Sequence, residues 1–440
     1  MSQSVFYDAQ CETISRDELE QIQIERLQST LNRVYRNVAF YRTAFDAHHI
    51  DLDKLTSVKA LETLPFTTKE DLHESYPYGM FAVPLRDIVR IHSTLGSPGR
   101  PVVVGYTHND LRTWTECTAR LLVAAGITEH DVVQIALDYN IAPGAFGFHH
   151  GAERIGASVI PTSLTMGVER QLLIMQDFKT TALITTPAYA VTLAADLEQI
   201  HLHPERLSLR LGLFGGQQWS DGLRRQLEQR LHIVCVDTYG LTEILGPGVA
   251  GECHGRDGLH INEDHFIVEV IDPKTLQPVQ DGDKGELVLT TLTREGFPLI
   301  RYRTGDITSI HRTPCSCGRT FARMARVMAR TDDMILFRGV GFFPSQVEQI
   351  LSEFPGISGH YQIVLGQEGT TDTLEIRTEV SDKIPSWDEL RTLETLRTEM
   401  ARRVKTVLDV DAKVTFVEPK SLQGLAGDRR VLDERPEVRE

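Results

Sequence analysis

The stretch Tyr239-Gly240-Leu241-Thr242-Glu243 decides the fold that we expect. It follows the apolar run His232–Val236 and precedes the loop Ile244–Gly248. A β-rich run that ends in an aromatic residue, a glycine and a Thr-Glu pair indicates a buried strand with polar groups at its C-terminal end. Open α/β sheets bind their ligands at that end, so we expect the functional site there.

Short apolar runs alternate with amphipathic segments between about residues 89 and 304. The apolar runs are 132–137, 157–161, 182–186, 211–214 and 233–236, and the helical candidates are 110–125, 168–178, 187–198 and 221–231. This alternation predicts an α/β fold whose mixed sheet is mostly parallel and has helices on both faces. After Asp264, hairpin-like strands at 265–271 and 285–291 predict a small antiparallel subdomain.

The two ends of the chain have different patterns. Ser15 offers a capping start for a helical region over 15–44, and Thr67 or Thr68 offers a second helix start. From Arg330 onward, a strand pair, a helix at 344–354, a strand near 361–366 and a helix around 389–407 predict a compact α+β domain. We therefore expect an N-terminal domain at 1–330 and a small C-terminal domain at 331–440.

The composition excludes several classes of protein. The net charge of −15 argues against a nucleic-acid binder, which needs a basic face to neutralise phosphates. No apolar run reaches the roughly 18 residues that span a bilayer, and the N-terminus lacks the pattern of a signal peptide. A cytoplasmic enzyme is expected, with its six cysteines as thiols or metal ligands rather than disulfides.

Three of the six cysteines and one histidine have the spacing of a metal site. Cys253 and His260 form a Cys-x6-His pair, and Cys315 and Cys317 form a Cys-x-Cys knuckle. Four soft ligands are enough for a closed, tetrahedral and therefore structural Zn²⁺. His254 is the competing fourth ligand, and two unrelated turns with free thiols are the alternative.

Three further stretches are expected to meet the Tyr239–Glu243 stretch in space. They are His92–Pro101, Phe214–Trp219 and Tyr302–Asp306. Small residues let backbone N–H groups approach a phosphate closely, and Ser or Thr hydroxyls supplement them. In this order and at these separations, the four stretches resemble the motif set of the adenylate-forming enzymes. The surrounding sequence, which includes Leu64–Asp71, Arg338-Gly339-Val340 and Val431-Leu432-Asp433, resembles the phenylacetate-CoA ligase branch over nearly all 440 residues.

The resemblance implies roles for individual residues. Thr242 would hold the α-phosphate, Glu243 would help to bind Mg²⁺, and Asp306 would bind the ribose. Residues implied in binding ATP or AMP are Ser93, Thr94, Gly96, Ser97, Gly99, Arg100, Gly215, Gly216, Gln217, Tyr239, Gly240, Thr242, Asp306 and Arg330. Those implied in the acyl pocket are Tyr139, Asn140, Ala145, Phe146, Gly215 and Tyr239. Asp332 would be the hinge of a mobile C-terminal domain, with Arg338 and Gly339 near the path of CoA or phosphopantetheine.

Three departures from the family pattern all affect the use of ATP. Pro98 and Arg100 stand where the phosphate loop of the family has Ser or Thr and Lys, and Gln217 stands where a Glu is common. The C-terminal segment Gly427–Asp433 contains no lysine. Asp428 occupies the position at which the family has its catalytic lysine. Losing such a transition-state contact costs a few kcal/mol, or roughly two to three orders of magnitude in rate.

Three functions are therefore weighed. The first is an enzyme that joins an aromatic or similar small carboxylic acid to CoA, or to the phosphopantetheine of a carrier protein, through an acyl-adenylate. The second is an ATP-independent transfer of the acyl group between CoA and an acyl carrier protein. The third is a non-catalytic scaffold that binds acyl-adenylate or acyl-CoA. The resemblance also implies a homodimer.

Overall fold

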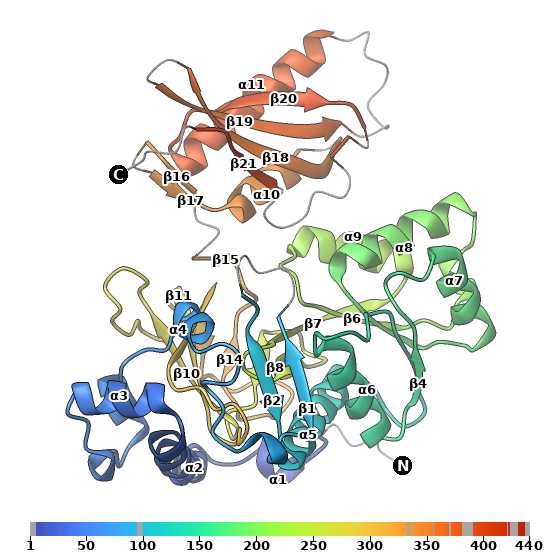
Figure 1. Cartoon of the computed structure of the whole chain (residues 1–440). Helices are drawn as coiled ribbons and strands as arrows, with labels where there is room; N and C mark the ends of the chain where they lie inside the picture. Colours follow the sequence, from blue (N-terminus) through green and yellow to red (C-terminus); the bar gives the residue numbers. More distant parts are fainter. Residues whose placement is uncertain are drawn as a thin grey trace. The chain divides into compact units, whose positions relative to one another are not determined.

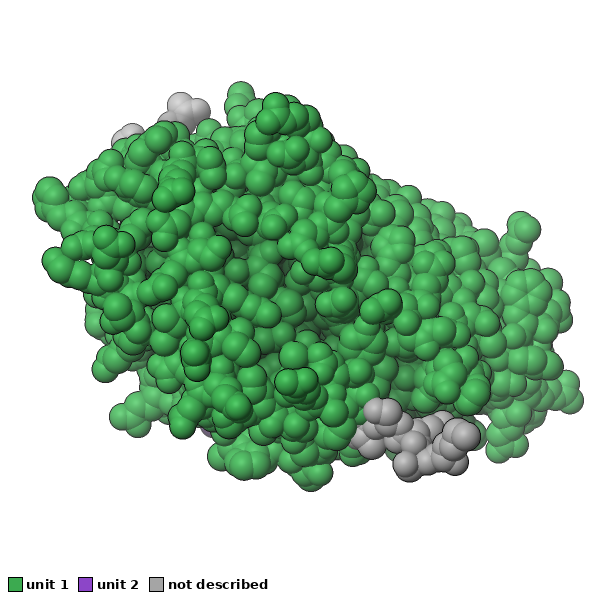
Figure 2. Space-filling model, turned by 90° about the horizontal axis from the view of Figure 1, so that it is seen from below, with its two compact units in different colours: residues 1–327 green, residues 328–440 purple. Residues whose placement is uncertain are grey.

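The chain forms two compact units, residues 1–327 and residues 328–440. The computed structural model describes residues 6–94, 100–331, 335–338, 340–354, 356–368, 371–380, 390–419, 421–422 and 430–435. Figure 1 shows the two units as ribbons, and Figure 2 shows one face of unit 1 as space-filling atoms. None of the described helices combines the length and the apolar character that crossing a membrane requires.

A nine-stranded mixed sheet is the centre of unit 1, with the strand order β13-β14-β9-β8-β7-β6-β5-β3-β4. The five strands from β7 to β4 pair in parallel, and the remaining pairs are antiparallel. The strands are β3 (Val132–Ile135), β4 (Ser158–Pro161), β5 (Ala182–Thr185), β6 (Leu211–Gly215), β7 (Val234–Leu241), β8 (Gly246–Glu252), β9 (Leu259–Ile261), β13 (Ile310–His311) and β14 (Arg323–Met324). The parallel half consists of the apolar runs that the sequence analysis assigned to it, and the α/β fold class is confirmed.

Helices cover both faces of this sheet. Leu183 and Phe214 pack with α7 (Val168–Asp177), α8 (Pro187–Gln199) and α9 (Asp221–Leu231) in one buried cluster. Their chain neighbours Ile184 and Leu213 pack with α5 (His108–Ala125) and α6 (Gly144–Arg154) in another. Because adjacent side chains of a strand point to opposite faces, the two clusters lie on opposite sides of the sheet.

The helical region expected over 15–44 contains two consecutive helices. A capping box of Ser15 and Glu18 starts the first helix, as the sequence indicated. Val38 is extended, with φ −113° and ψ 110°, and this residue separates the two helices. A second capping box, of Thr68 and Asp71, starts α4. The elements before the first sheet are α1 (Ala9–Glu12), α2 (Arg16–Asn37), α3 (Ala39–Ala47), η1 (Leu52–Lys54), η2 (Val58–Thr63), α4 (Lys69–Glu74) and η3 (Leu85–Asp87).

Two antiparallel arrangements complete unit 1. β1 (Arg90–Ser93) and β2 (Val103–Tyr106) form a hairpin, and β10 (Phe266–Ile271), β11 (Gly285–Thr291) and β12 (Tyr302–Thr308) form the predicted antiparallel subdomain. Residues 298–300 are a buried connection, in which the N–H and the carbonyl of Leu299 bond to Thr291. The Tyr302–Asp306 stretch that follows is part of the strand β12.

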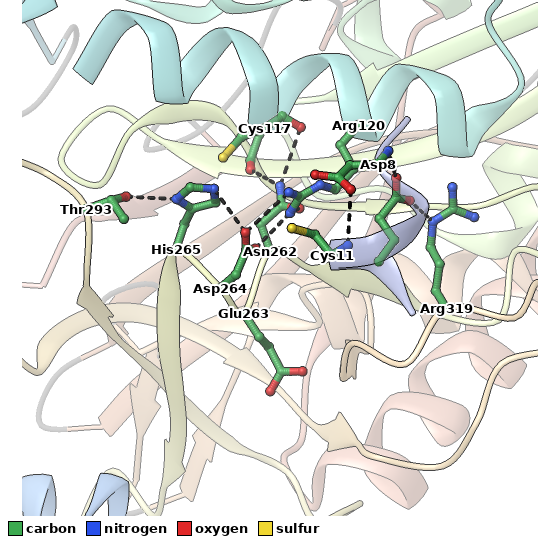
Figure 3. A network of polar contacts seen from close by, with 12 residues as sticks. Asp8, Cys11, Cys117, Arg120, Asn262, Glu263, Asp264, His265, Thr293 and Arg319 are labelled. Atoms are coloured by element: carbon green, nitrogen blue, oxygen red, sulfur yellow. Dashed lines mark hydrogen bonds and ion pairs between the residues drawn. The ribbon is translucent and has the colours of Figure 1, made fainter. Parts of the chain in front are cut away.

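A buried polar network joins α5 to the turn before β10 (Figure 3). The Arg120 guanidinium donates to Asn262 Oδ1 and to Asp264 Oδ1, both at 2.8 Å. His265 contacts Asp264 at 3.2 Å and Thr293 Oγ1 at 2.9 Å. The two Arg120 contacts connect chain segments more than 140 residues apart, so they fix the turn before β10 against α5.

Unit 2 has its own sheet and its own core. The order β20-β19-β18-β21 combines one antiparallel pair, β18–β19, with parallel strands at both edges. Its elements are β15 (Ala329–Arg330), β16 (Ile335–Phe337), β17 (Val340–Phe342), α10 (Pro344–Ser352), β18 (Ile357–Glu368), β19 (Thr371–Val380), α11 (Leu390–Leu408), β20 (Lys413–Val417) and β21 (Val431–Asp433). The predicted α+β composition of this end of the chain is observed, with β18 longer than the expected strand.

Candidate active site

The Tyr239–Glu243 stretch lies at the turn between β7 and β8. β7 extends beyond the apolar run 233–236 through Leu241, with a register shift between Tyr239 and Gly240. A Cβ atom on Gly240 would lie 2.0 Å from the carbonyl oxygen of Gly246, so only glycine allows the two strands to approach this closely. The site therefore forms where the sheet changes from parallel to antiparallel pairing.

Tyr239 and Asp306 meet across two sheets. The Tyr239 hydroxyl donates to Asp306 Oδ2 at 2.6 Å, although 67 residues separate the two. Asp306 is 6 % exposed and lies on β12, where Thr304 Oγ1 accepts its backbone N–H at 3.1 Å. The carboxylate is thus held in one orientation next to the aromatic ring that the sequence placed in the site.

Glu243 lies in the same turn, and its side chain is largely enclosed. The Tyr302 hydroxyl lies 3.5 Å from Glu243 Oε1, and the Tyr106 hydroxyl donates to the carbonyl of Leu245 at 3.0 Å. These contacts attach the turn to β12 and to β2. A buried carboxylate at this position can act as a ligand for a divalent cation.

The expected phosphate loop is the connection between β1 and β2. Thr94 closes its base, because its N–H donates to the Val102 carbonyl and its Oγ1 accepts the Val102 N–H, both at 3.0 Å. Arg100 turns its guanidinium toward the ring of Tyr76, at 5.5 Å from the centroid. Ser93 is buried at the end of β1, and Gly96, Ser97 and Gly99 lie outside the described residues.

The expected adenine loop starts at the end of β6. Gly215 pairs with Thr238 of β7, and a Cβ on Gly215 would lie 2.3 Å from Thr238 Oγ1. Gly216 has a positive φ of 74°, which turns the chain away from the sheet. Gln217 Oε1 accepts the N–H of Ala188 at 3.3 Å, at the N-terminus of α8. The side-chain amide of Gln217, which stands where the family commonly has a Glu carboxylate, thus contacts the start of α8.

The residues predicted for the acyl pocket divide into two groups. The rings of Tyr139 and Phe146 are 5.3 Å apart and nearly perpendicular, whereas Ala145 is buried in the core cluster of α5 and α6. Asn140 is exposed, and its Oδ1 accepts the N–H of Ala142. The start of α6 packs closely on β8, because a Cβ on Gly147 would lie 2.6 Å from Pro247.

Sequence reasoning did not single out the histidines around this segment. His92 Nδ1 bonds to the Ile141 carbonyl at 2.9 Å, and its ring lies 5.4 Å from that of Phe146. The Tyr139 hydroxyl and His149 Nδ1 are 3.1 Å apart. Burial lowers the pKa of His92. In the sequence, the only signal was that His92 is the first residue of the stretch His92–Pro101.

One buried cluster combines Cys253, which follows β8, His260 of β9, and Cys315 and Cys317, which lie between β13 and β14. Their ligand atoms all lie within 4.8 Å of one another, with 3.8 Å between the sulfurs of Cys253 and Cys315 and 3.4 Å between Cys317 Sγ and His260 Nε2. His254 is exposed and is not part of the cluster. Contact with the Cys253 thiol and then with His260 lowers the pKa of the Cys317 thiol. One histidine and three sulfurs in this arrangement fit a tetrahedral Zn²⁺.

Comparison with known proteins identifies the family. Residues 87–292 match the model described as AMP-binding enzyme, and residues 339–435 match that of the AMP-binding enzyme C-terminal domain. A phenylacetate-coenzyme A ligase of Thermus thermophilus is 41% identical over 98% of this chain and 100% of its own length. The chain belongs to the phenylacetate-CoA ligase branch of the AMP-binding enzymes. A phenylacetate-coenzyme A ligase of Escherichia coli is 40% identical over 96% of this chain and 97% of its own length.

Solved structures of AMP-binding enzymes agree with the fold. The structure of 2-hydroxyisobutyryl-CoA ligase in the postadenylation state with 2-HIB-AMP has a TM-score of 0.89 at 29% identity, covering 99% of this chain and 93% of that chain. The same enzyme with 2-HIB-AMP and CoA in the thioesterification state has a TM-score of 0.73 at 30% identity. The resemblance inferred from the four motifs is thus confirmed at the level of family and fold.

The C-terminal residues predicted for this AMP-binding enzyme lie in unit 2. Arg338 is at the exposed tip of the β16–β17 hairpin with a positive φ of 49°, and its guanidinium donates to the carbonyl of Asp372. Arg330 ends β15. Asp332, Gly339 and residues 427–429 of the lysine-free segment Gly427–Asp433 lie outside the described residues, and the end of that segment forms β21.

Proposed function

We propose that this protein activates a small carboxylic acid, of aromatic type, as an acyl-adenylate and transfers the acyl group to the thiol of CoA. The observation that carries the proposal is the hydrogen bond of 2.6 Å between Tyr239 and Asp306, with Glu243 in the same turn. It joins the ends of two motifs that the sequence predicted to share a nucleotide site. The names of the relatives, phenylacetate-coenzyme A ligase, support the aromatic substrate.

Each residue of this site has a chemical task in the proposed reaction. The Asp306 carboxylate accepts hydrogen bonds from the ribose hydroxyls, and Tyr239 orients that carboxylate. The Thr242 hydroxyl donates to the α-phosphate, which is attacked by the substrate carboxylate with release of pyrophosphate. Glu243 would hold Mg²⁺, whose charge offsets that of the phosphates. The CoA thiol then displaces AMP from the acyl group.

Unit 2 is proposed as the mobile part of the enzyme. Asp332 would be the hinge, and Arg338 with Gly339 would lie near the path of the thiol acceptor. Domain rotation of this kind presents different faces of a lid to the two half-reactions. The proposed boundary of the N-terminal domain at residue 330 falls within three residues of the boundary between the compact units.

The sequence of residues 427–433 favours a second candidate. Asp428 adds negative charge where the adenylation step needs a cation. The thioester-forming step does not need that cation, so transfer of a preformed acyl group between CoA and a carrier protein is the competing proposal.

One experiment distinguishes the two candidates. The protein is incubated with ATP, Mg²⁺ and a panel of aryl carboxylates, with and without CoA, and both pyrophosphate and thioester are measured. Pyrophosphate above background supports the ligase, and its loss in Asp306→Ala but not in the control Asp281→Ala assigns the site. No pyrophosphate, together with transfer from an aryl-CoA to a carrier protein, contradicts the ligase and supports the transferase.

We also propose that the cysteine cluster holds a structural Zn²⁺. Residues Cys253, His260, Cys315 and Cys317 supply a full set of four ligands, so that no position is open for a substrate. His260 Nδ1 is buried and has no hydrogen-bond partner among the described residues. The metal would join the loop after β8 to the loop after β13.

A further inference from the structure

Arg326 lies between two parts of the proposed nucleotide site. It is the residue before Val327, with which unit 1 ends. On one side of it, Ala325 is fixed to the end of β12, because its N–H donates to the Ser309 carbonyl at 2.8 Å and its carbonyl accepts the Thr308 hydroxyl at 2.7 Å. β12 is the strand that carries Asp306.

On its other side, Arg326 holds the end of the adenine loop. The guanidinium lies 5.7 Å from the centroid of the Trp219 ring and donates to the Trp219 carbonyl at 3.4 Å. It also forms an ion pair with Asp221, the first residue of α9. Trp219 follows Gly215-Gly216-Gln217-Gln218 directly, so Arg326 fastens the C-terminal end of that loop across 107 residues of sequence.

The partner of Arg326 is itself well fixed. Trp219 is 6 % exposed and packs edge-on against Phe214 at 5.8 Å. Arg224 lies 5.1 Å from the same indole ring and forms a buried ion pair with Glu252 at 2.8 Å. Only Arg326, however, connects Trp219 to the β12 side of the site among the contacts of the described residues.

We propose that Arg326 is a positioning residue that holds the 215–219 loop at a fixed distance from the strand carrying Asp306. The loop and the strand are the proposed walls of the adenine and ribose pocket, so Arg326 sets the width of that pocket. This inference rests on the proposed function. It assigns to Arg326 an effect on nucleotide affinity and not on the bond-forming steps, because the hydrogen bonds and the cation–π contact of its side chain are made with Trp219 and Asp221.

The test uses full-length Arg326→Ala, Arg326→Lys and Asp221→Asn. Hydrogen–deuterium exchange of the ligand-free proteins measures the loop, and calorimetric titration with AMP measures the affinity. We expect faster exchange over 214–219 and about five-fold weaker AMP binding in Arg326→Ala, in line with the loss of a cation–π contact and an ion pair. Arg326→Lys should recover part of the affinity, because an ammonium group can still lie over the indole ring.

The controls separate positioning from general damage. Arg312→Ala removes a comparable exposed ion pair, with Asp281, and should change neither measurement. Asp221 is 68 % exposed, so Asp221→Asn should fold normally and give a smaller loss than Arg326→Ala. In steady-state assays of Arg326→Ala, KM for ATP should rise while kcat stays near that of the wild type.

The outcomes distinguish this inference from the proposed function. Unchanged exchange and unchanged AMP affinity in Arg326→Ala would overturn the inference alone. Absence of AMP binding by the wild-type protein would overturn both. AMP binding that depends on Arg326, without any pyrophosphate release, would support the inference and contradict the ligase.

Discussion

Replacing Arg120 with methionine tests the buried network that holds α5 against the turn before β10. The side chains of Arg120 and Asp264 are 8 % and 6 % exposed, and their charged atoms are 2.8 Å apart. Removing one partner of a buried ion pair costs about 3–5 kcal/mol, because the other charge stays buried without compensation. Arg26, at 3.9 Å from Asp264, remains as a partner of that carboxylate in the variant. We therefore expect the free energy of unfolding to fall by an amount near the lower end of this range, about 3 kcal/mol.

Urea unfolding followed by tryptophan fluorescence measures this loss. Trp114 and Trp219 lie in unit 1, and a Trp387→Phe background removes the third tryptophan, which belongs to unit 2. The signal then reports the unfolding of the unit that contains the network. Equal slopes in urea for variant and parent are required before the free energies are compared.

Two further variants define the result that refutes the reasoning. Arg120→Met/Asp264→Asn should lose less than the sum of the single variants, because no uncompensated charge remains buried. The exposed pair Arg312–Asp281 is the matched control, and Arg312→Met should cost less than about 1 kcal/mol. A loss for Arg120→Met as small as that of Arg312→Met would show that the network does not stabilise unit 1.

Three other perturbations test separate parts of the molecule. Burial lowers the pKa of His265 to about 4, below its ordinary value of roughly 6.5, so the unfolded chain binds a proton that the folded chain does not. The free energy of unfolding should therefore fall by up to about 3 kcal/mol as the pH falls from 6.5 to 4, and urea unfolding of His265→Gln should lack this slope. Tyr239→Phe removes the donor that orients Asp306 and should raise KM for ATP about tenfold in a pyrophosphate assay, and an unchanged KM would contradict the assigned role. Cys317→Ser should lower the bound zinc from about one ion per chain and reduce Tm; equal metal content in both proteins would exclude the proposed site.

The parallel half of the large sheet could be predicted because hydrophobic runs determine it. Residues 182–185 and 211–214 are buried on both faces, and such runs read as continuous apolar segments. The antiparallel half could not be predicted in the same way. β8 has the sequence Gly-Pro-Gly-Val-Ala-Gly-Glu, in which every residue except the valine has low strand propensity, and pairing with β7 and β9 imposes its conformation.

The candidate site also has one part that could be predicted from the sequence and one that could not. Tyr239, Glu243 and Asp306 could be named in advance because motif spacing marks them, and the structure brings them together. The contacts that hold the site were not predictable, since Arg326 and Trp219 are 107 residues apart and neither periodicity nor composition connects them. Long-range contacts of this kind depend on the tertiary fold alone.

The separate core of unit 2 has a consequence for the history and the engineering of the gene. The buried residues of its hydrophobic cluster come from residues 335–414, whereas those of the largest cluster of unit 1 end at residue 324, with Val327 packed against that cluster. A crossover between codons 327 and 328 would therefore divide neither of these two clusters. Shuffling this C-terminal segment among homologous genes is thus a route by which new combinations of the two units can arise without redesign of either hydrophobic cluster.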